Sequence, residues 1–347
     1  MISQPAFTIS VQGVVLGDAA SRLDLLRRME QLGADSFLLG DHPGGGPSPF
    51  VVLGAAAMLS ERLRLGAYVA NVGLRDPVQL AVDVATLDRL SGGRALLGLG
   101  AGHTPGEWTA SGLPFPPARQ RLERLVEAVE VVRRLLAGEV VRFEGAHLRL
   151  DDAVLLEPLP VQDPVPLLIG GNGRGVLRLA GCHADIVGLT GLGRTLADGH
   201  HHEVEWSPEQ VDATVELVRR AASDAARERP PELEALVQHV ELSDDRDRTA
   251  VEVAARVPGL RPEDVLTAPY VLVGTAAEIA DHIVTVRRRW GITRFVVRPP
   301  ALDAIEMVLA QAEPTESAQP DGPVLTQRPA GVVGNLPCMT VRVDEDP

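Results

Sequence analysis

Short apolar segments alternate with amphipathic segments along the first hundred residues. This alternation predicts strands that are apolar on both faces, separated by helices with one apolar face. The predicted strands are Phe7–Gly13, Ser36–Leu39, Arg64–Asn71 and Arg94–Leu99, and the predicted helices are Asp18–Leu32, Pro49–Leu63 and Pro77–Leu90. Strands of this kind, spaced by about 30 residues and alternating with helices, indicate a parallel sheet that helices cover.

The alternation is interrupted between Gly100 and Pro164 and then resumes. The interruption holds a strong helical pattern, Arg119–Leu136, and a predicted hairpin, Val140–Leu156. Four more strands are predicted after it: Val165–Ile169, Asp185–Leu189, Glu234–Leu242 and Arg294–Arg298. Eight βα units close a barrel, whereas five or six would favour an open sheet. We therefore predict an α/β fold, a (β/α)8 TIM barrel with an insertion after strand 4 and a C-terminal extension.

Domain boundaries follow from this pattern and from a change in composition near the C-terminus. Residues 1–312 form the predicted barrel, with the insertion at about 104–164. Residues 313–347 contain six prolines and six acidic residues but only two arginines, which predicts an extended or mobile tail. A short strand at Met339–Val343 is compatible with this tail. The alternative is an arm that packs on a partner subunit.

Composition and charge exclude several classes of function. The net charge of −14 argues against nucleic-acid and anionic-membrane partners. All 33 basic residues are arginines, which excludes a Schiff-base lysine, a lysine general base and a Walker-type phosphate lysine. The two cysteines cannot build a disulfide framework, and we expect no metal site. The N-terminus lacks the basic and apolar regions of a signal peptide, so the expected location is cytoplasmic.

Two clusters of glycines follow strands of the predicted barrel, where the chemistry of such barrels is placed. Gly98, Gly100 and Gly102 end the fourth strand, and the segment Gly170–Gly173 ends the fifth. Glycine lets the backbone approach a ligand, and N–H groups before a helix can bind a phosphate. The other interpretation is that both segments are tight turns. If the clusters form one binding site, they must meet at one rim of the barrel.

Ionisable residues stand at the ends of the second and fourth strands. Asp41 and His42 end the second strand, and His103 and Glu107 follow the fourth. An acid and an imidazole at such positions suit proton transfer, and a buried glutamic acid can act as a proton donor. The structural alternatives are a capping aspartate, a stacked histidine and a glutamate that stabilises a helix start. The tract His200–His202 lacks the context of a metal motif and is interpreted as a polar loop.

One set of segments resembles a known family. The run Gly98–His103 (GLGAGH), followed by Glu107-Trp108, the stretch Gly112–Pro117 (GLPFPP) and Arg121, is similar to the luciferase-like monooxygenase superfamily. Within it, the similarity is strongest to oxidoreductases that depend on the deazaflavin coenzyme F-420 (F420). The segments Pro166–Gly173 (PLLIGGNG) and Leu272–Thr275 (LVGT) fit as well, and the resemblance covers about residues 7 to 310.

The resemblance implies a barrel that is usually dimeric, with the coenzyme at the C-terminal ends of the strands. Asp41, His42 and Glu107 would be catalytic, and the peptide Val69–Ala70 or Ala70–Asn71 would form a non-prolyl cis bulge behind the reactive ring. The implied cofactor contacts are Ala70, Asn71, Gly100, Ala101, Gly102, His103, Gly170, Gly171, Asn172 and Gly173. An arginine such as Arg174 or Arg298 would replace any lysine contact to a phosphate or to a polyglutamate tail.

The implied function is hydride transfer between F420 and a small organic substrate, as reduction of a C=C or C=N bond or as the reverse oxidation of an alcohol. The insertion would cover the substrate. An FMN-dependent monooxygenase that uses reduced flavin and O2 is the alternative with the same fold. An inert barrel that binds a partner protein is the alternative of another class. The substrate itself is not specified by the sequence.

Overall fold

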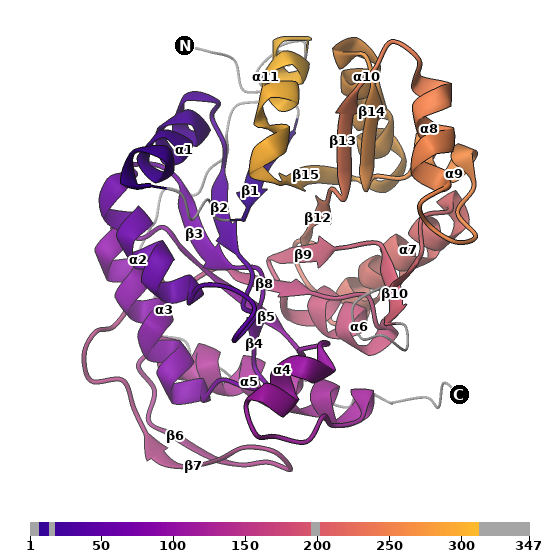
Figure 1. Ribbon diagram of the computed structural model, residues 1–347. Helices are drawn as coiled ribbons and strands as arrows, with labels where there is room; N and C mark the ends of the chain where they lie inside the picture. Colours follow the sequence, from indigo (N-terminus) through magenta and orange to yellow (C-terminus); the bar gives the residue numbers. More distant parts are fainter. Residues whose placement is uncertain (1–6, 14–17, 196–201, 312–347) are drawn as a thin grey trace.

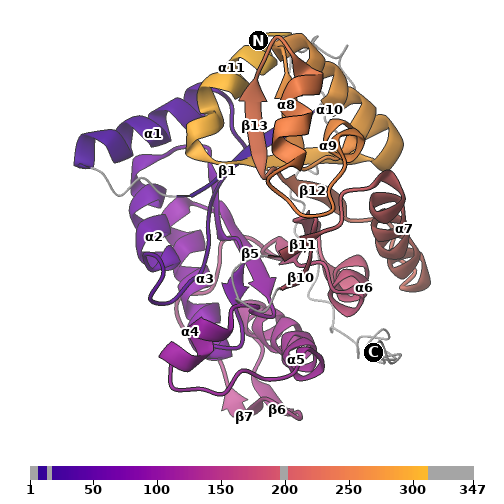
Figure 2. The same cartoon turned by 45° about the vertical axis from the view of Figure 1, so that its right-hand side comes forward.

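The computed structural model describes residues 7–13, 18–195 and 202–311, and these residues form a closed parallel barrel (Figures 1 and 2). The tail at 313–347, with the strand expected at Met339–Val343, lies outside the described residues. The barrel strands are β1 (Thr8–Gln12), β2 (Ser36–Leu39), β3 (Arg64–Ala67), β5 (Ala95–Gly100), β8 (Leu167–Gly170), β9 (Ile186–Leu189), β12 (Glu232–Leu236) and β15 (Ile292–Val297). Their order is β3-β2-β1-β15-β12-β9-β8-β5, and pairing of β3 with β5 closes the ring. The predicted (β/α)8 fold is confirmed.

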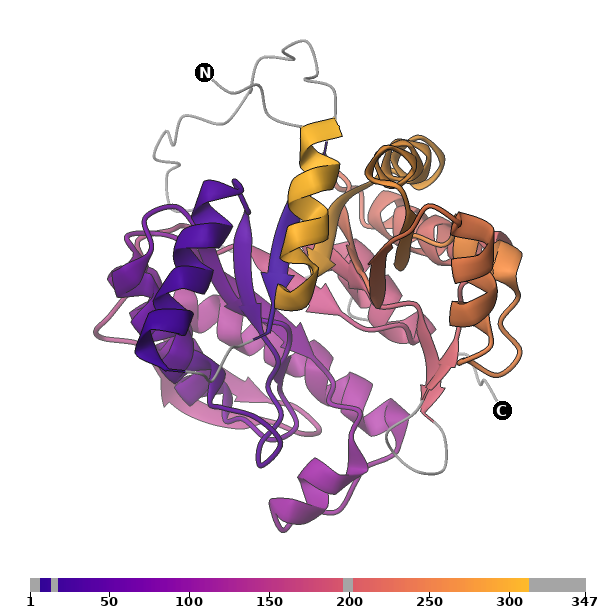
Figure 3. The ribbon, with the colours of Figure 1, turned by 45° about the horizontal axis from the view of Figure 1, so that its top comes forward.

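Helices surround the barrel, as Figure 3 shows with the top of the molecule turned forward. The chain specifies their ends by local chemistry: Asp76 caps one helix start, while Gly92 and Gly291 end helices in the left-handed conformation. Two helices begin with capping boxes, at Ser207 and at Thr275. The surrounding helices are α1 (Ala19–Gln31), α2 (Pro49–Leu59), α3 (Pro77–Ser91), α5 (Ala118–Leu136), α6 (Arg174–His183), α7 (Pro208–Asp224), α10 (Ala276–Trp290) and α11 (Leu302–Gln311).

The barrel separates two hydrophobic cores. The larger one lies between the strands and the helices. The smaller one uses residues of the opposite strand face, which is the interior of a closed barrel, because successive side chains of a strand alternate between faces. It consists of Leu38, Tyr68, Leu96, Leu168, Ile186, Leu236 and Val296, with Val69 packed against it. The barrel interior is therefore filled by side chains, and ligands are restricted to its ends.

Charged residues occupy the interior nearer the N-terminal ends of the strands. Arg294 contacts Glu234 and Glu232 at 3.1 Å each and also pairs with Asp35. Burial raises the pKa of Glu234 to about 7, although Arg294 opposes this shift. Ser10 donates to the same carboxylate at 3.5 Å. This network lies at the end of the barrel opposite to the one where βα barrels place their chemistry.

The seventh predicted strand, Glu234–Leu242, is wrong as a single strand. It comprises the end of β12 and a separate strand β13 (His239–Leu242), which pairs in parallel with β14 (Val271–Gly274) in a small sheet of its own. The backbone changes partner between them, because Val237 donates to Val296 of β15 whereas Gln238 donates to Tyr270. Two helices without a predicted counterpart, α8 (Arg246–Ala254) and α9 (Pro262–Thr267), connect β13 to β14.

The segment predicted as an insertion divides between two places. Helix α4 (Pro105–Ala110) follows β5 at the C-terminal ends of the strands. Helix α5 belongs to the surrounding layer, where it buries Leu125, Val129 and Val132 and packs on α3. The predicted hairpin is present as β6 (Val141–Glu144) and β7 (Arg149–Ala153), beyond α5 in Figure 1. Of these elements, α4 lies at the mouth of the barrel, where a cover for the substrate was predicted.

A buried histidine predicts how stability depends on pH. His282 is 8% exposed, its Nε2 lies 3.0 Å from the carbonyl oxygen of Ala268, and burial lowers its pKa to about 4. In the unfolded chain this histidine is protonated below about pH 6.5, whereas in the folded protein it stays neutral down to about pH 4. Its contribution to the free energy of unfolding is therefore fully present above pH 6.5 and is lost as the pH falls toward 4. We expect this histidine to remove up to about 3 kcal/mol from the unfolding free energy at pH 4.

Urea denaturation between pH 7.5 and 4.5 checks this expectation, with His282→Gln as the variant. The variant should show a shallower fall of the unfolding free energy with decreasing pH. Burial also lowers the pKa of His183 to about 4, and this residue contributes equally to the pH dependence of both proteins. Identical slopes in the two proteins would remove His282 from this role.

Candidate functional site

The strand predicted at Arg64–Asn71 is interrupted near its C-terminal end. Strand β3 ends at Ala67, the peptide bond Tyr68–Val69 is cis, and β4 (Ala70–Asn71) then resumes pairing with β5. The bulge expected at Val69–Ala70 or Ala70–Asn71 therefore lies at the preceding bond. The carbonyl oxygen of Tyr68 accepts a hydrogen bond from the side chain of Gln12 at 3.3 Å. The bulge thus lies over the filled interior, at the mouth of the barrel.

Glycines of the neighbouring strands make room for this bulge. A Cβ atom added at Gly98 would overlap the carbonyl oxygen of Ala67, and one added at Gly100 would overlap Cγ2 of Val69. At Gly170 it would lie 3.0 Å from Cγ1 of Val69. These glycines therefore have a packing role within the protein itself. The interpretation that these glycines also let the protein backbone approach a ligand stays a prediction.

The two glycine-bearing turns meet at one rim, as one binding site requires. Their strands are neighbours in the barrel, with Leu97 opposite Leu167 and Leu99 opposite Ile169. Val69 lies between them, close to both Gly100 and Gly170. The expectation that the two turns meet at one rim is confirmed.

Asn71 connects the bulge to the turn after β5. Its Oδ1 accepts from the backbone N–H of Gly73 at 3.0 Å, and its Nδ2 donates to Oε2 of Glu107 at 3.4 Å. Gly102 takes a left-handed φ of +72°, and a Cβ atom there would overlap the amide group of Asn71. Arg121 donates to the carbonyl oxygen of Gly102 and lies over the ring of Phe115. Ala70, Asn71, Gly100 and Gly102 are thus brought together.

Asp41 is held entirely by protein donors. Its carboxylate makes a two-pronged ion pair with Arg75, at 2.6 and 2.8 Å, and accepts from the backbone N–H of Asn71 at 3.0 Å. The side chain is 2% exposed. Asp41 is therefore placed to orient its neighbours, and its burial keeps the carboxylate from solvent. Sequence reasoning missed Arg75, because nothing local marks a partner 34 residues away.

His42 and Glu107 form a pair at the mouth. Nδ1 of His42 lies 2.6 Å from Oε1 of Glu107, and the side chains are 49% and 10% exposed respectively. Glu107 comes from the first turn of α4, which Pro105 begins, and Trp108 beside it is buried. One member of the pair is thus accessible and the other enclosed. Such a pair can take up or deliver a proton at the His42 ring.

His103 extends this group of rings. Its ring centre lies 6.3 Å from that of His42 and 5.2 Å from that of His202. Desolvation by the surrounding protein, together with the nearby His202 and His42, lowers the pKa of His103. The imidazole is therefore uncharged at neutral pH. His202 begins β11 (His202–Val204), which pairs with β10 (Leu192–Thr195); His200 and His201 of the predicted polar loop lie outside the described residues.

The turn after β8 leads into α6. Gly173 is the N-terminal cap of this helix and provides no capping side chain, so N–H groups of the first turn have no side-chain acceptor there. Asn172 donates to Thr190 and to the carbonyl oxygen of Leu192, while its Oδ1 accepts from the N–H of Thr190 at 3.3 Å. Asn172 therefore holds the turn after β9. A ligand at this rim would meet backbone N–H groups.

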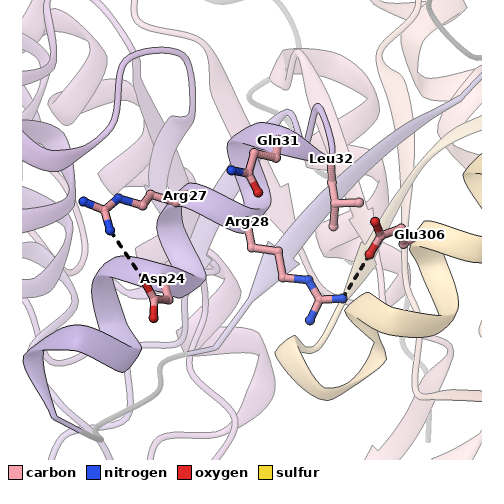
Figure 4. Close-up of a pocket in the computed structure, with 6 residues that line it drawn as sticks. All are labelled: Asp24, Arg27, Arg28, Gln31, Leu32 and Glu306. Atoms are coloured by element: carbon pink, nitrogen blue, oxygen red, sulfur yellow. Dashed lines mark hydrogen bonds and ion pairs between the residues drawn. The ribbon is translucent and has the colours of Figure 1, made fainter.

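One hollow among the described residues reaches the C-terminal ends of the barrel strands β1 and β15. It measures about 760 Å³ and is lined by residues that include Gln12, Gly13, Arg298 and Pro299. Another, of about 400 Å³, lies on the outer surface between α1 and α11 (Figure 4). There Arg28 pairs with Glu306 at 3.3 Å, and the lining is mostly charged. This outer hollow is not a candidate site.

No group of three or more His, Cys, Asp or Glu side chains in residues 7–13, 18–195 and 202–311 is arranged to hold a metal ion. Over the same residues, no helix combines the length and the apolar character that crossing a membrane requires.

Comparison with known proteins adds a family. Residues 6–294 match the model of the family described as luciferase-like monooxygenase. The chain is 34% identical over 221 residues to an F420-dependent glucose-6-phosphate dehydrogenase of Kineococcus radiotolerans, which covers 59% of this chain and 65% of that relative, just under two thirds of its length. An F420-dependent secondary alcohol dehydrogenase, solved with an F420-acetone adduct, superposes with a TM-score of 0.71 at 20% identity, over 88% of this chain and 99% of that one. The F420-dependent tetrahydromethanopterin reductase of Methanopyrus kandleri superposes with a TM-score of 0.67 at 21% identity, over 88% and 98% of the two chains. At 20% and 21% identity, these two superpositions establish a shared fold and nothing further.

Proposed function

The chain belongs to the luciferase-like monooxygenase family, and from this premise we propose that it transfers a hydride between F420 and a small organic substrate. One observation carries the proposal: the His42–Glu107 pair, 2.6 Å apart, stands beside the bulge on the rim that both glycine turns share. The printed names of the relative from Kineococcus radiotolerans and of the two superposed proteins support F420 as the coenzyme.

The residues present fit such a coenzyme. The turn Gly171–Gly173 would hold its phosphate with backbone N–H groups, because the first turn of α6 lacks a capping side chain. The ring would lie against the bulge at Val69, with Ala70, Gly100, Ala101, Gly102 and His103 along the side chain of the coenzyme. When bound, F420 supplies a carbon that gives or accepts a hydride. A lysine-free chain requires backbone and arginine donors of this kind.

The residues of the protein handle the proton that accompanies the hydride. His42, which is half exposed, would contact the substrate. The enclosed Glu107 would orient the His42 ring and accept or return the proton that His42 exchanges with the substrate. Asp41 would keep Asn71 in place through the Asn71 backbone N–H, so we propose it as a positioning residue. Helix α4 would exclude water above the reacting atoms.

Two reactions are compatible with hydride transfer at this site. Reduction of a C=C or C=N bond, with the hydride given by reduced F420, is the proposed reaction. The alternative is oxidation of an alcohol to a carbonyl compound, with the hydride accepted by oxidised F420. The names of the relative from Kineococcus radiotolerans and of the secondary alcohol dehydrogenase favour the oxidation. The His42–Glu107 pair serves both directions, because a group that delivers a proton in one takes it up in the other. We also propose a homodimer, which light scattering on the purified 36.9 kDa chain would test.

Coenzyme choice tests the proposal directly. We expect the purified protein to quench or polarise the fluorescence of F420 at micromolar concentration and to bind FMN at least tenfold more weakly. Absorbance of bound F420 should then change on addition of an alcohol or, starting from the reduced form, of an enone or imine. Tight FMN binding with NADH-driven consumption of O2 would replace the proposal by the monooxygenase alternative.

Gly171→Val provides the site-specific arm of the same experiment and should weaken F420 binding about tenfold or more, because a side chain there blocks backbone approach. Its Cβ would also lie 3.0 Å from Cγ1 of Val176, at a φ of +149°, so the loop itself could move. Gly173→Ala separates the two causes, since the nearest protein atom to its Cβ is 4.0 Å away. Gly54→Ala, in α2, is the control. Full affinity in both turn variants would place the phosphate elsewhere.

A further inference from the structure

We propose that Arg298, positioned by Gln12, binds an anionic group of the substrate, a carboxylate or a phosphate, at the wall of the mouth opposite the glycine turns. The proposal rests on the proposed function and adds a substrate class to it. The order of strands in the ring places β15 four positions from β5 and β1 four positions from β8. Each polar residue thus stands across the barrel from a glycine-bearing strand.

Strand register directs Arg298 toward the mouth. Val296 belongs to the interior cluster and Arg294 to the interior charge network, so the alternate position 298 continues the same face of the chain, just after β15. By the same alternation, Gln12 follows Ser10, which contacts Glu234 inside the barrel. Arg298 and Gln12 are therefore the residues that these two strands present at the mouth.

A chain of hydrogen bonds holds the guanidinium group. Nη1 of Arg298 donates to Oε1 of Gln12, and Nε2 of Gln12 donates to the carbonyl oxygen of Tyr68 in the cis peptide, at 3.3 Å. This carbonyl belongs to the bulge against which the coenzyme ring is proposed to lie. Arg298 is thereby fixed beside the reacting region.

Arg298 differs from Arg75 and Arg294 in having no acidic partner among the described residues. Arg75 is paired with Asp41, and Arg294 with three carboxylates. Within residues 7–13, 18–195 and 202–311, no carboxylate lies within ion-pair distance of Arg298. An arginine has five N–H donors in a planar fork that matches carboxylate and phosphate oxygens, and Gln12 uses only one nitrogen of that fork.

The space beside Arg298 can admit such a group. The hollow of about 760 Å³ extends from the ends of β1 and β15 to α1 and α11. It is lined by Gln12, Gly13, Ser21, Asp24, Leu25, Arg28, Arg298, Pro299, Pro300 and Leu302, so that the carboxylate of Asp24 shares it with two arginines. The proposed phosphate turn of the coenzyme lies on the far wall, which leaves this side for the substrate. A cationic anchor there also offsets the unfavourable approach of an anion to a chain of net charge −14.

Binding of inorganic phosphate tests the anchor, measured by isothermal titration calorimetry at constant ionic strength. We expect millimolar binding to the wild type and a loss of about tenfold or more in Arg298→Gln, since a charge-assisted hydrogen bond is removed. Arg298→Lys should fall between them, because it keeps the charge and loses the fork. Arg288→Gln, an exposed arginine on α10, is the matched control and should bind like the wild type.

A second titration identifies the source of the anion. With F420 at saturation, phosphate should bind with unchanged affinity, and Arg298→Gln should bind F420 within threefold of the wild type. Competition between phosphate and F420 that disappears in Arg298→Gln would assign Arg298 to the coenzyme tail and overturn the proposal, as would equal phosphate binding by wild type and Arg298→Gln. Failure of the wild type to bind F420 would contradict the proposed function alone, because the phosphate titration is made without the coenzyme.

Discussion

Glu107→Gln is expected to lower the turnover number about a hundredfold or more, while F420 affinity stays within threefold of the wild type. The magnitude is that of losing one positioned proton-transfer group. Glutamine keeps the shape of Glu107 and an oxygen that can accept from Asn71, but it cannot hold the proton that His42 exchanges. Steady-state kinetics and fluorescence titration of F420 measure the two quantities separately.

Glu123→Gln is the matched control for this experiment. Glu123 contacts Nε2 of His147 at 3.0 Å, which reproduces a glutamate–histidine pair between α5 and the hairpin β6–β7. Its turnover number should equal that of the wild type. An unchanged turnover number in Glu107→Gln would remove Glu107 from proton transfer. An equal loss of turnover and of F420 affinity would reassign it to maintaining the mouth.

Gly98→Ala should destabilise the ligand-free protein by about 3 kcal/mol, the upper part of the range for overpacking a core. The added methyl group would overlap the carbonyl oxygen of Ala67, a backbone atom next to the cis bulge. The backbone cannot withdraw without disturbing the pairing of β3 with β2 and β5 that closes the barrel. Urea denaturation measures the unfolding free energy.

At Gly100 the atom that an added methyl group would overlap belongs to a side chain, that of Val69, which can itself be shortened. A Cβ atom at Gly100 would overlap Cγ2 of Val69, so Gly100→Ala should destabilise, and Val69→Ala should restore part of the loss. We expect a coupling free energy of about 1–3 kcal/mol in the double-mutant cycle. Gly54→Ala, in the interior of α2, should not destabilise. Additive effects of Gly100→Ala and Val69→Ala would show that the bulge does not require this glycine.

Much of the fold was predictable because barrel strands carry local signals. A strand that is buried on both faces must be apolar throughout, and a helix must start and end at capping residues, so the alternation of strands and helices is visible in the sequence. The same patterns placed Asp41, His42, Gly100, Glu107 and Gly170 at strand ends, and hence at one rim. Their arrangement at that rim could not be predicted in detail.

The error in the seventh strand has a physical origin. The strand predicted at Glu234–Leu242 remains apolar through a point where its backbone exchanges one hydrogen-bonding partner for another. The apolar face of α5, within the predicted insertion, likewise does not indicate that this helix packs on α3. Hydropathy reports that a residue is buried, but not which element buries it.

From its order of residues alone, this chain specifies a lysine-free (β/α)8 barrel with glycines and ionisable groups at the ends of its strands. Folding in three dimensions adds the pairing of Arg75 with Asp41, the contact of His42 with Glu107, and the link from Tyr68 through Gln12 to Arg298. These contacts join residues between 34 and 286 positions apart. Hydrogen bonds and ion pairs depend on distances of a few ångströms, which arise only when strands remote in sequence become neighbours in the closed ring.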